Sequence, residues 1–312
     1  MLIETLSTFP HMYDSVMGES MMKRAQEKGI LEFRAHDLRD WTHDRHRTTD
    51  DDPYGGGAGL VMKCEPIFEA VEAILGKGFV EAKLAAIMGE RGEDVGCPDR
   101  ASSAATGTAQ WAVPQSEDCL SESGYPTSSP QEELQHHRPQ IVFLAPQGRP
   151  FDDAYADKLA AADHLLFICG HYEGIDERVY TLADHVISLG DYVLTSGELA
   201  SMVVIDAAVR KLPGVLGAAE GPVDESFTSG LLEYPQYTRP ADFRGMAVPE
   251  VLTSGNHAAI ARWRREQSLA RTAAARPDLI AAAEAAGRLT PADQKFLKLL
   301  EPAPTGAAEG VS

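Results

Sequence analysis

Three short apolar runs constrain the fold of this chain more than any other feature. They are IVFLA at 141–145, LLFICG at 165–170 and HVISLG at 185–190, and a stretch of helical character, DAYADKLAAADH, follows the first of them. Each run lacks the regular alternation of polar and apolar residues that marks a half-exposed strand, so each predicts a strand buried on both faces. Strands that alternate with helices and long loops indicate an α/β sheet.

Polar loops leave the carboxyl ends of all three predicted strands. These loops are APQGRP at 145–150, GHYEGIDER at 170–178 and LGDYVLTSGE at 189–198. Ligands of open α/β sheets bind beyond these strand ends, so the loops predict a small-ligand site. Glu173 in the second loop could act as a general base, bind a metal ion, accept hydrogen bonds from ribose hydroxyls, or form a salt bridge with Arg178. The spacing alone leaves these roles open.

A helix is predicted to follow the third loop, over LASMVVIDAAVRKL at 199–212. Thr195 and Glu198 have the spacing of a capping box at its start. Arg210 lies near its end, where a cation interacts favourably with the helix macrodipole. Spacing by itself favours that structural role for Arg210 over a catalytic one. The apolar residues at helical spacing are Leu199, Met202, Val203, Ala207 and Leu212.

Composition bounds the class of protein. The chain has 312 residues, of which 44% are apolar, enough for about two domains. No run of about 18 apolar residues predicts a membrane span, and the N-terminus lacks the pattern of a secretory signal. The four cysteines form no C-x-x-C pair, and Cys169 lies inside LLFICG, which predicts a reduced thiol in the core. These features together predict a cytoplasmic protein.

Charge is distributed unevenly along the chain. The net charge of −19 argues, taken alone, against a nucleic-acid partner. Residues 90–137 carry nine acidic residues against two arginines, whereas residues 239–276 carry seven arginines against three acidic residues. The acidic excess is therefore partly separated from a basic C-terminal region, which leaves a nucleic-acid partner open.

Composition also marks the domain organisation. The segment from about 76 to 137 interrupts the α/β pattern, and its later part is rich in Ser, Pro, Ala and Gln, which predicts a largely flexible insertion. We expect a first domain over 1–219 that contains this insertion, an interdomain linker over 220–232, a helical domain over 233–302 and a flexible tail over 303–312.

The predicted linker contains an unusual pair of acidic residues. GPVDESFTSG at 221–230 has the glycine, proline and serine content of a flexible connector, yet Asp224 and Glu225 lie side by side in it. In the helical domain that follows, Asn256 is placed to cap a helix that carries Trp263 and Leu269 on an apolar side. Common motifs are missing: YGGGAGLVMK lacks the G-K-[ST] of a P-loop, and no G-x-S-x-G marks a serine hydrolase.

Seven stretches in order resemble one known family. They are THDRHRTTDDDPYGGGAGLVMK, LAPQG, CGHYEGIDERV, LGDYVLTSGEL, RKLPGVLG, SGLLEYPQYTRP and VPEVLTSGNHAAIARWRREQSLART. Together they are similar to the bacterial tRNA (guanine-N1)-methyltransferases, which methylate the guanosine at tRNA position 37. The resemblance covers most of 1–75 and 139–276.

The resemblance implies a SPOUT-type fold, which is a mainly parallel α/β sheet tied in a deep trefoil knot, with a small C-terminal helical domain. It also implies a homodimer, a tRNA substrate with guanosine at position 37, and S-adenosylmethionine as the methyl donor. The residues that it places around the donor are Phe143, Leu144, Pro146, Gln147, Gly170, Tyr172, Glu173, Leu189, Gly190, Asp191, Tyr192, Val193 and Leu194.

The resemblance further implies catalytic roles for the linker acid and for Arg210. The family has an aspartate directly before Ser-Phe, whereas this chain has Asp224-Glu225-Ser226-Phe227. Register favours Glu225 as the general base, and a one-residue shift would make it Asp224. Arg210 would stabilise the charge that develops on guanine O6, which replaces the structural role suggested by spacing. Mg²⁺ dependence is also implied, with Glu173 as the carboxylate near the ion.

Residues that contact tRNA follow from the same resemblance. The expected set is His46, Tyr54, Gly55, Gly56, Gly57 and Gly59 near the N-terminus, and Arg262, Arg264, Arg265 and Arg271 in the helical domain. Two alternatives remain: a related SPOUT methyltransferase that acts on another RNA base, and an RNA-binding protein without catalytic activity. The linker acid and the region from TRP to GNH at 238–257 argue against the first, and the joint presence of the pocket residues, Arg210 and the linker acid argues against the second.

Overall fold

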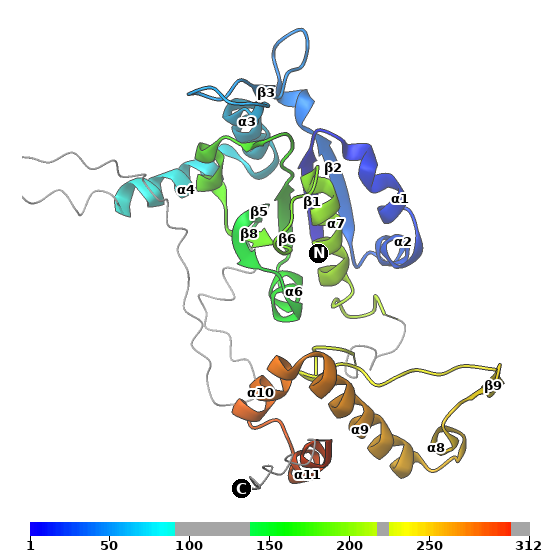
Figure 1. Cartoon of the computed structure of the whole chain (residues 1–312). Coiled ribbons are helices and arrows are strands. Elements are labelled where there is room, and N and C mark those ends of the chain that lie inside the picture. Colours follow the sequence, from blue (N-terminus) through cyan, green and yellow to red (C-terminus); the bar gives the residue numbers. More distant parts are fainter. Residues whose placement is uncertain (91–137, 217–224, 301–312) are drawn as a thin grey trace, which may run out of the picture. The chain divides into compact units, whose positions relative to one another are not determined.

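The computed structural model describes residues 1–90, 138–216 and 225–300. The chain divides into two compact units, Met1–Val215 and Leu216–Ser312, which Figure 1 shows coloured along the sequence. The predicted boundary at 219/220 differs from this division by four residues. Asp224, the predicted tail and most of the predicted insertion lie outside the described residues.

A five-stranded sheet forms the centre of the first unit (Figure 1). Its strands follow the order β2-β1-β6-β5-β8, and every neighbouring pair is parallel. This confirms the parallel α/β sheet; the trefoil knot stays a prediction. The strands are β1 (Leu2–Ser7), β2 (Glu32–Asp37), β5 (Gln140–Pro150), β6 (His164–Ile168) and β8 (His185–Ser188).

Helices cover both faces of this sheet. Along β5, Val142 packs into one hydrophobic cluster and Phe143 into the other, so the strand is buried on both sides as predicted. One face is covered by α1 (Asp14–Met17), α2 (Ser20–Glu27), α6 (Asp153–Ala160) and α7 (Gly197–Val209). The other is covered by α3 (Cys64–Leu75), α4 (Lys77–Glu90) and the 3₁₀ helix Glu177–Leu182.

A second, small sheet connects the glycine-rich loop to the loop after β6. It contains β3 (Asp50–Asp51), β4 (Val61–Met62) and β7 (Gly174–Ile175). Strands β3 and β4 form an antiparallel hairpin, and β4 pairs with β7 in parallel. The glycine loop between β3 and β4 is therefore held next to the predicted ligand site by backbone hydrogen bonds.

Helix α4 corrects the start of the predicted insertion. Residues 77–90 are helical, Val80 is buried, and Lys83 pairs with Asp184 at 2.8 Å. Lys83 also donates a hydrogen bond to the carbonyl of Leu182 at 2.9 Å. Val80 is the one buried residue among 77–89, and apolar residues such as Met88 are exposed. The sequence therefore shows no single apolar stripe from which this helix could be predicted.

Helix α7 begins and packs differently from the prediction. Ser196 is its N-cap and makes no side-chain capping bond, so Thr195 and Glu198 do not form a capping box. Glu198 instead accepts a hydrogen bond from the hydroxyl of Ser7 on β1. Of the predicted apolar face, Met202 is buried and Leu212 packs against the core, whereas Leu199 and Val203 are exposed. The other core contacts of the helix come from Val204, Ile205, Ala208 and Val209.

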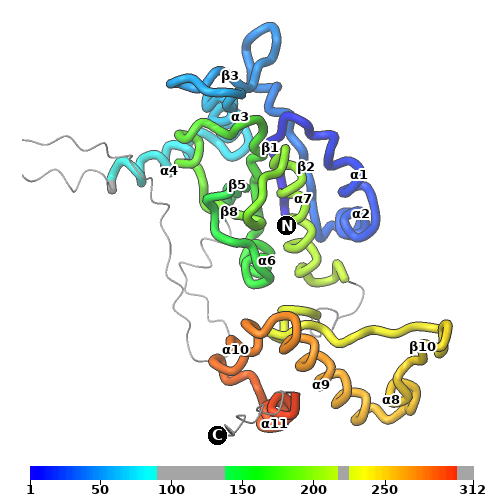
Figure 2. Tube along the Cα trace, in the orientation of Figure 1, coloured from blue at the N-terminus to red at the C-terminus, as the bar shows by residue number. Residues whose placement is uncertain are grey.

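The second unit is mostly helical. Its long helix α9 (His257–Ala275) begins at Asn256, whose side chain accepts from the amide of Ala259 at 3.1 Å, which confirms the predicted cap. Leu231 and Leu269 are buried in its small core. Figure 2 traces the chain through the remaining elements, which are β9 (Asp242–Phe243), β10 (Met246–Ala247), α8 (Glu250–Thr253), α10 (Pro277–Ala285) and α11 (Pro291–Leu300).

The described part of the predicted linker is folded into this unit. The amide of Phe227 donates to the carbonyl of Leu231 at 2.9 Å, and that of Gly230 donates to Phe227 at 2.8 Å. Gly230 has φ +76°, and a Cβ there would overlap the guanidinium of Arg288. The half of the connector that carries Glu225 is therefore a hydrogen-bonded turn.

Candidate functional site

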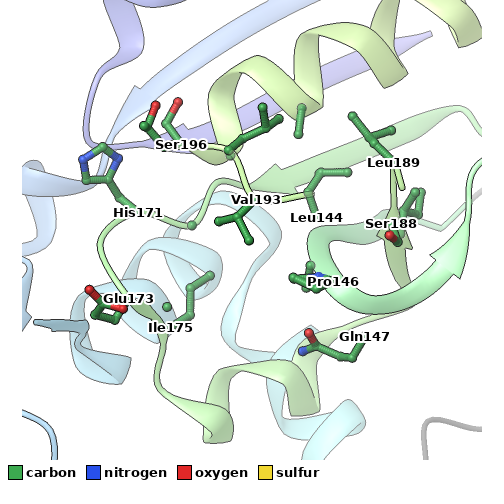
Figure 3. A pocket seen from close by; sticks show the side chains of 18 of the residues that line it. Leu144, Pro146, Gln147, His171, Glu173, Ile175, Ser188, Leu189, Val193 and Ser196 are labelled. Carbon is green, nitrogen blue, oxygen red and sulfur yellow. The ribbon is translucent and has the colours of Figure 1, made fainter. Parts of the chain in front are cut away.

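A cavity of about 410 Å³ lies beyond the carboxyl ends of β5, β6 and β8. All three predicted polar loops contribute to its wall, so the convergence expected from the sequence is confirmed (Figure 3). The predicted donor-binding residues that line it are Leu144, Pro146, Gln147, Gly170, Tyr172, Glu173, Leu189, Gly190, Tyr192, Val193 and Leu194.

A bulge in β5 shapes one rim of this cavity. The pairing of β5 with β8 shifts register between Leu144 and Arg149, so Pro146 and Gln147 leave the regular ladder and line the cavity. Gly148 lies directly on the backbone of β8, because a Cβ there would be 2.5 Å from the amide nitrogen of Ile187. A bulge re-aims side chains in this way without ending the strand.

Two predicted residues do not line the cavity. Phe143 is fully buried in β5, and its ring centroid lies 4.9 Å from that of Tyr180. Asp191 is exposed and absent from the wall. Both are adjacent in sequence to lining residues. Phe143 points away from the cavity because alternate residues of a strand face opposite sides. Asp191 lies in an exposed turn, where its charged side chain is in solvent.

Several lining residues were missed by the sequence prediction. His171 and Ser196 lie in the same loops as predicted residues, and Ser188 ends β8 directly before Leu189. Position in or next to these loops was a signal that could have found them. Tyr180 and Ala200 come from the following helices, and only the packing of those helices places them at the cavity.

Acidic side chains give the cavity its charge. Among the described residues that line it, Glu173 and Glu177 are acidic and none is lysine or arginine. The interpretation that Glu173 forms a salt bridge with Arg178 is wrong. Arg178 instead donates to both carboxylate oxygens of Asp176, at 2.9 and 2.7 Å. That pairing lowers the pKa of Asp176 and leaves Glu173 at the cavity.

Glu173 also explains one glycine of the glycine-rich loop. Gly59 has φ +85°, and a Cβ there would overlap the side chain of Glu173. The glycine therefore provides both a left-handed backbone conformation and room for the carboxylate. His46 and Tyr54 are exposed on the same hairpin, and Gly55 and Gly56 have open space around their Cα atoms.

A buried polar network lies behind the cavity. The hydroxyl of Tyr13 lies 3.0 Å from Sγ of Cys169 and 2.6 Å from Oγ of Ser201. Burial raises the pKa of the Cys169 thiol to about 12, and it raises the pKa of Tyr13 as well. Cys169 is therefore a protonated core thiol, as the sequence predicted, and it does not serve as a nucleophile at neutral pH.

The predicted catalytic residues are distributed over both units. Arg210 is half-buried at the C-terminal end of α7 in the first unit. Glu225 is half-buried at the start of the folded turn in the second unit. Both residues have interactions with neighbouring groups. Their joint role stays a prediction.

The four predicted arginines of the second unit all have partners within it. Arg265 forms a two-bond ion pair with Asp293, at 3.1 and 2.9 Å. The other three make single contacts: Arg262 with Glu266 at 2.8 Å, Arg264 over the ring of Tyr234 at 4.7 Å, and Arg271 with the carbonyl of Glu233 at 3.0 Å. Their contact with tRNA stays a prediction, and Arg265 is the one most committed to the fold.

Within the described ranges, 1–90, 138–216 and 225–300, no three His, Cys, Asp or Glu side chains come together as a metal site. His43 pairs with Glu69 at 2.7 Å. The same ranges contain no helix with the length and apolarity needed to cross a membrane.

Comparison with known proteins identifies the family. A family model described as tRNA (Guanine-1)-methyltransferase TrmD matches residues 1–97 and 124–282, so the part without a counterpart inside the predicted insertion is 98–123. A tRNA (guanine-N(1)-)-methyltransferase of Limosilactobacillus reuteri is 45% identical over 91% of each chain. Proteins of that name from Geotalea uraniireducens and Symbiobacterium thermophilum are each 44% identical over 96% of this chain and 97% of their own. The chain therefore belongs to the tRNA (guanine-1)-methyltransferase TrmD family.

Proposed function

We propose that this protein transfers a methyl group from S-adenosylmethionine to N1 of guanosine 37 in tRNA. The observation that carries the proposal is the cavity at the carboxyl ends of β5, β6 and β8, where the three loops expected to hold the donor meet. The names of the relatives support the reaction and its guanine N1 target.

The cavity suits the chemistry of S-adenosylmethionine. Leu144, Ile175 and Val193 provide apolar wall, while Glu173 and Glu177 supply negative charge for a ligand that carries a sulfonium and an ammonium group. Backbone groups of the 190–194 turn would bind the adenine edge, which explains a recognition loop with little side-chain charge. The donor, when bound, supplies an activated methyl group on sulfur, so the protein mainly has to orient the acceptor.

The acceptor requires a base because guanine N1 carries a proton. Glu225 would accept that proton, an effect worth typically ~10²–10⁴-fold in rate. Arg210 would stabilise the negative charge that moves to guanine O6 as N1 loses its proton. Glu225 belongs to the second unit and Arg210 to the first.

Mg²⁺ fits this site only as a loosely held ion. Glu173 is an exposed carboxylate at the cavity, and Mg²⁺ commonly binds one or two carboxylates together with water and substrate oxygens. The residues therefore suit an ion shared with the substrate. We propose Glu173 as its protein ligand.

A second copy of the chain is the proposed partner of the exposed apolar face near the cavity. Val193 and Val203 are 87% and 55% exposed, and Leu194 and Leu199 are also exposed. Apolar side chains gathered on one region mark association surfaces more often than free surface. A Val203→Lys variant should sediment as a monomer where the wild-type protein sediments as a dimer; unchanged dimers would place the interface elsewhere.

One assay tests the reaction directly. Purified protein is incubated with labelled S-adenosylmethionine and tRNA transcripts that carry either guanosine or adenosine at position 37. Label should enter only the guanosine transcript, and nuclease digestion should yield 1-methylguanosine. Equal incorporation into both transcripts would favour a methyltransferase acting on another base, and tRNA binding without incorporation would favour the non-catalytic alternative. We also propose a cytoplasmic location, where tRNA is the substrate.

A further inference from the structure

The end of α7, which carries the proposed catalytic residue Arg210, is fixed by an ion pair. Lys211 directly follows Arg210, and its Nζ lies 2.6 Å from Oδ1 of Asp153 and 3.3 Å from Oδ1 of Asp157. Both aspartates belong to α6, which covers the same face of the sheet as α7 (Figure 1). The side chain of Lys211 is only 9% exposed. A lysine is rarely buried this deeply unless it is paired, so the pair is a defined contact between the two helices.

The two carboxylates keep Lys211 charged in this position. Burial lowers the pKa of its ammonium group, but the hydrogen bond to Asp153 and the charges of Asp153 and Asp157 outweigh burial and raise the pKa above 10.5. The folded protein therefore holds an ammonium group between two carboxylates at neutral pH. A charge-assisted hydrogen bond requires a defined distance and direction, so this one ties the end of α7 to α6 at one point.

A second lysine holds the chain just after the same turn. Lys28, the C-cap residue of α2, donates from Nζ to the carbonyl of Gly214 at 2.7 Å. Gly214 has φ +84°, and a Cβ there would lie 3.2 Å from Cδ1 of Ile30. Leu212 and Val215 pack into the core of the first unit. The turn after α7 is therefore held by two lysine contacts and by apolar packing between them.

Backbone hydrogen bonds fix the turn from the other side. The amide of Arg210 donates to the carbonyl of Asp206 at 3.2 Å, and the amide of Lys211 donates to the carbonyl of Ala208 at 3.1 Å. The first bond has α-helical spacing and the second the tighter 3₁₀ spacing, so the helix tightens directly at Arg210. The Cα atom of Arg210 is thus fixed by its own helix and by the ion pair of the next residue.

We infer that Lys211 is a positioning residue for Arg210: its ion pair with α6 fixes the turn from which the guanidinium group acts on guanine O6. Electrostatic stabilisation of a transition state depends on donors that are already in place when charge develops. A displacement of ~1 Å can cost ~10²-fold in rate. The inference rests on the proposed function, which gives Arg210 its role, and Lys211 acts only through that arginine.

Lys211→Met tests this role, because methionine keeps an unbranched side chain and removes the charge. Single-turnover methyl transfer to tRNA should slow by ~10-fold or more. Calorimetry should show unchanged affinity for S-adenosylhomocysteine, because the cavity is lined by the start of α7 and Lys211 follows its end. Asp153→Asn weakens the same pair without altering α7 and should slow transfer in the same direction. Wild-type rates in both variants would overturn the inference.

A double-mutant cycle separates positioning from a general loss of structure. Arg210→Ala removes the guanidinium group, so adding Lys211→Met to that variant should slow methyl transfer little further. If the two rate losses instead multiply in the double variant, Lys211 does not act through Arg210 and the inference is wrong.

Lys83→Met is the matched control for stability. Lys83 pairs with Asp184 at 2.8 Å, and the two side chains are 12% and 10% exposed, so this variant breaks a comparably shielded pair in the same unit. Its melting temperature should fall, as that of Lys211→Met does, while its rate of methyl transfer below the melting range stays at the wild-type level. Equal slowing in both lysine variants would overturn the inference.

The same measurements distinguish failure of the inference from failure of the proposed function. An active wild-type protein, a slow Arg210→Ala variant and a fast Lys211→Met variant would overturn the inference alone. Absence of methyl transfer by the wild-type protein would overturn the proposed function, and the inference with it.

Discussion

The cavity of the first unit and helix α9 of the second unit differ in whether their polar side chains have partners within the fold. At the cavity, folding leaves His171 Nδ1 and Ser196 Oγ without hydrogen-bond partners. On α9, folding gives each of the predicted phosphate-binding arginines a partner inside the unit. A preformed pocket with unpaired polar atoms binds a small ligand with little rearrangement, whereas an RNA surface made of paired arginines must exchange internal contacts for phosphates.

The largest expected effect concerns the proposed general base, which lies in the second unit. Glu225→Gln should lower the rate of methyl transfer by ~10²–10⁴-fold, because the general base is lost, while S-adenosylhomocysteine binding stays unchanged. Single-turnover kinetics with saturating tRNA and calorimetry measure the two quantities. Asp224→Asn is the matched control and should leave the rate within a few-fold of wild type. The reverse result would assign the base to Asp224.

As the pH falls, the first unit should lose stability before the second unit does. Burial lowers the pKa of His185 in the first unit to about 4, from 6.5. The folded state therefore holds this histidine neutral, and stability present above pH 6.5 is lost as pH falls toward 4, by on the order of 3 kcal/mol. In the second unit, burial raises the pKa of Asp293, but hydrogen bonds from Arg265 and Thr290 outweigh it and hold the pKa below 3.8, so the corresponding loss begins only near pH 4.

Hydrogen exchange resolved by peptide should show this order. Peptides of β8 should lose protection between pH 6.5 and 4, while those of α9 and α11 keep theirs. His185→Gln should remove the loss in the first unit over that range. Simultaneous loss of protection in both units would contradict the separate titrations of His185 and Asp293.

The next largest effect is expected on ligand affinity, from a glycine whose backbone is closely packed at the cavity wall. A Cβ at Gly197 would lie 2.7 Å from the amide nitrogen of Gly170, so Gly197→Ala must displace the loop after β6. Affinity for S-adenosylhomocysteine should fall ~10-fold or more, as measured by calorimetry. Gly89→Ala on α4, where a Cβ meets open space, should leave affinity unchanged. Unchanged affinity in the Gly197 variant would show that this wall does not contact the ligand.

The smallest effects should distinguish two arginines of α9. Arg265→Ala leaves Asp293, which is only 5% exposed, without its ion-pair partner and should destabilise the second unit by ~1–3 kcal/mol. Arg264→Ala removes an exposed stacking contact and should change stability by less than about 1 kcal/mol. If Arg264 binds phosphate, its variant should also reduce the salt dependence of tRNA binding by about one ion. A stability loss in Arg264→Ala alone would reverse these assignments.

Local sequence determined the elements whose contacts are local. The buried strands at 141–145 and 165–170 were predictable because continuous apolar runs bounded by polar loops have few other stable solutions. Asn256 was predictable as a cap because its partner lies three residues away. Most of the cavity wall followed as well, since the carboxyl ends of parallel strands lie on one edge of a sheet.

Tertiary structure decided the features whose partners are distant in sequence. Glu198 matched a local capping pattern, but Ser7, 191 residues away, takes its carboxylate. Residues 77–90 lacked an independent helical pattern, yet Lys83 finds Asp184 and becomes part of the body. The bulge at Gly148 depends on the backbone of Ile187. A local sequence pattern indicates only which interactions a residue can make with its neighbours along the chain. When the residue packs against a segment remote in sequence, it meets a different partner and is less exposed to solvent. Those long-range interactions determined the final positions of these residues.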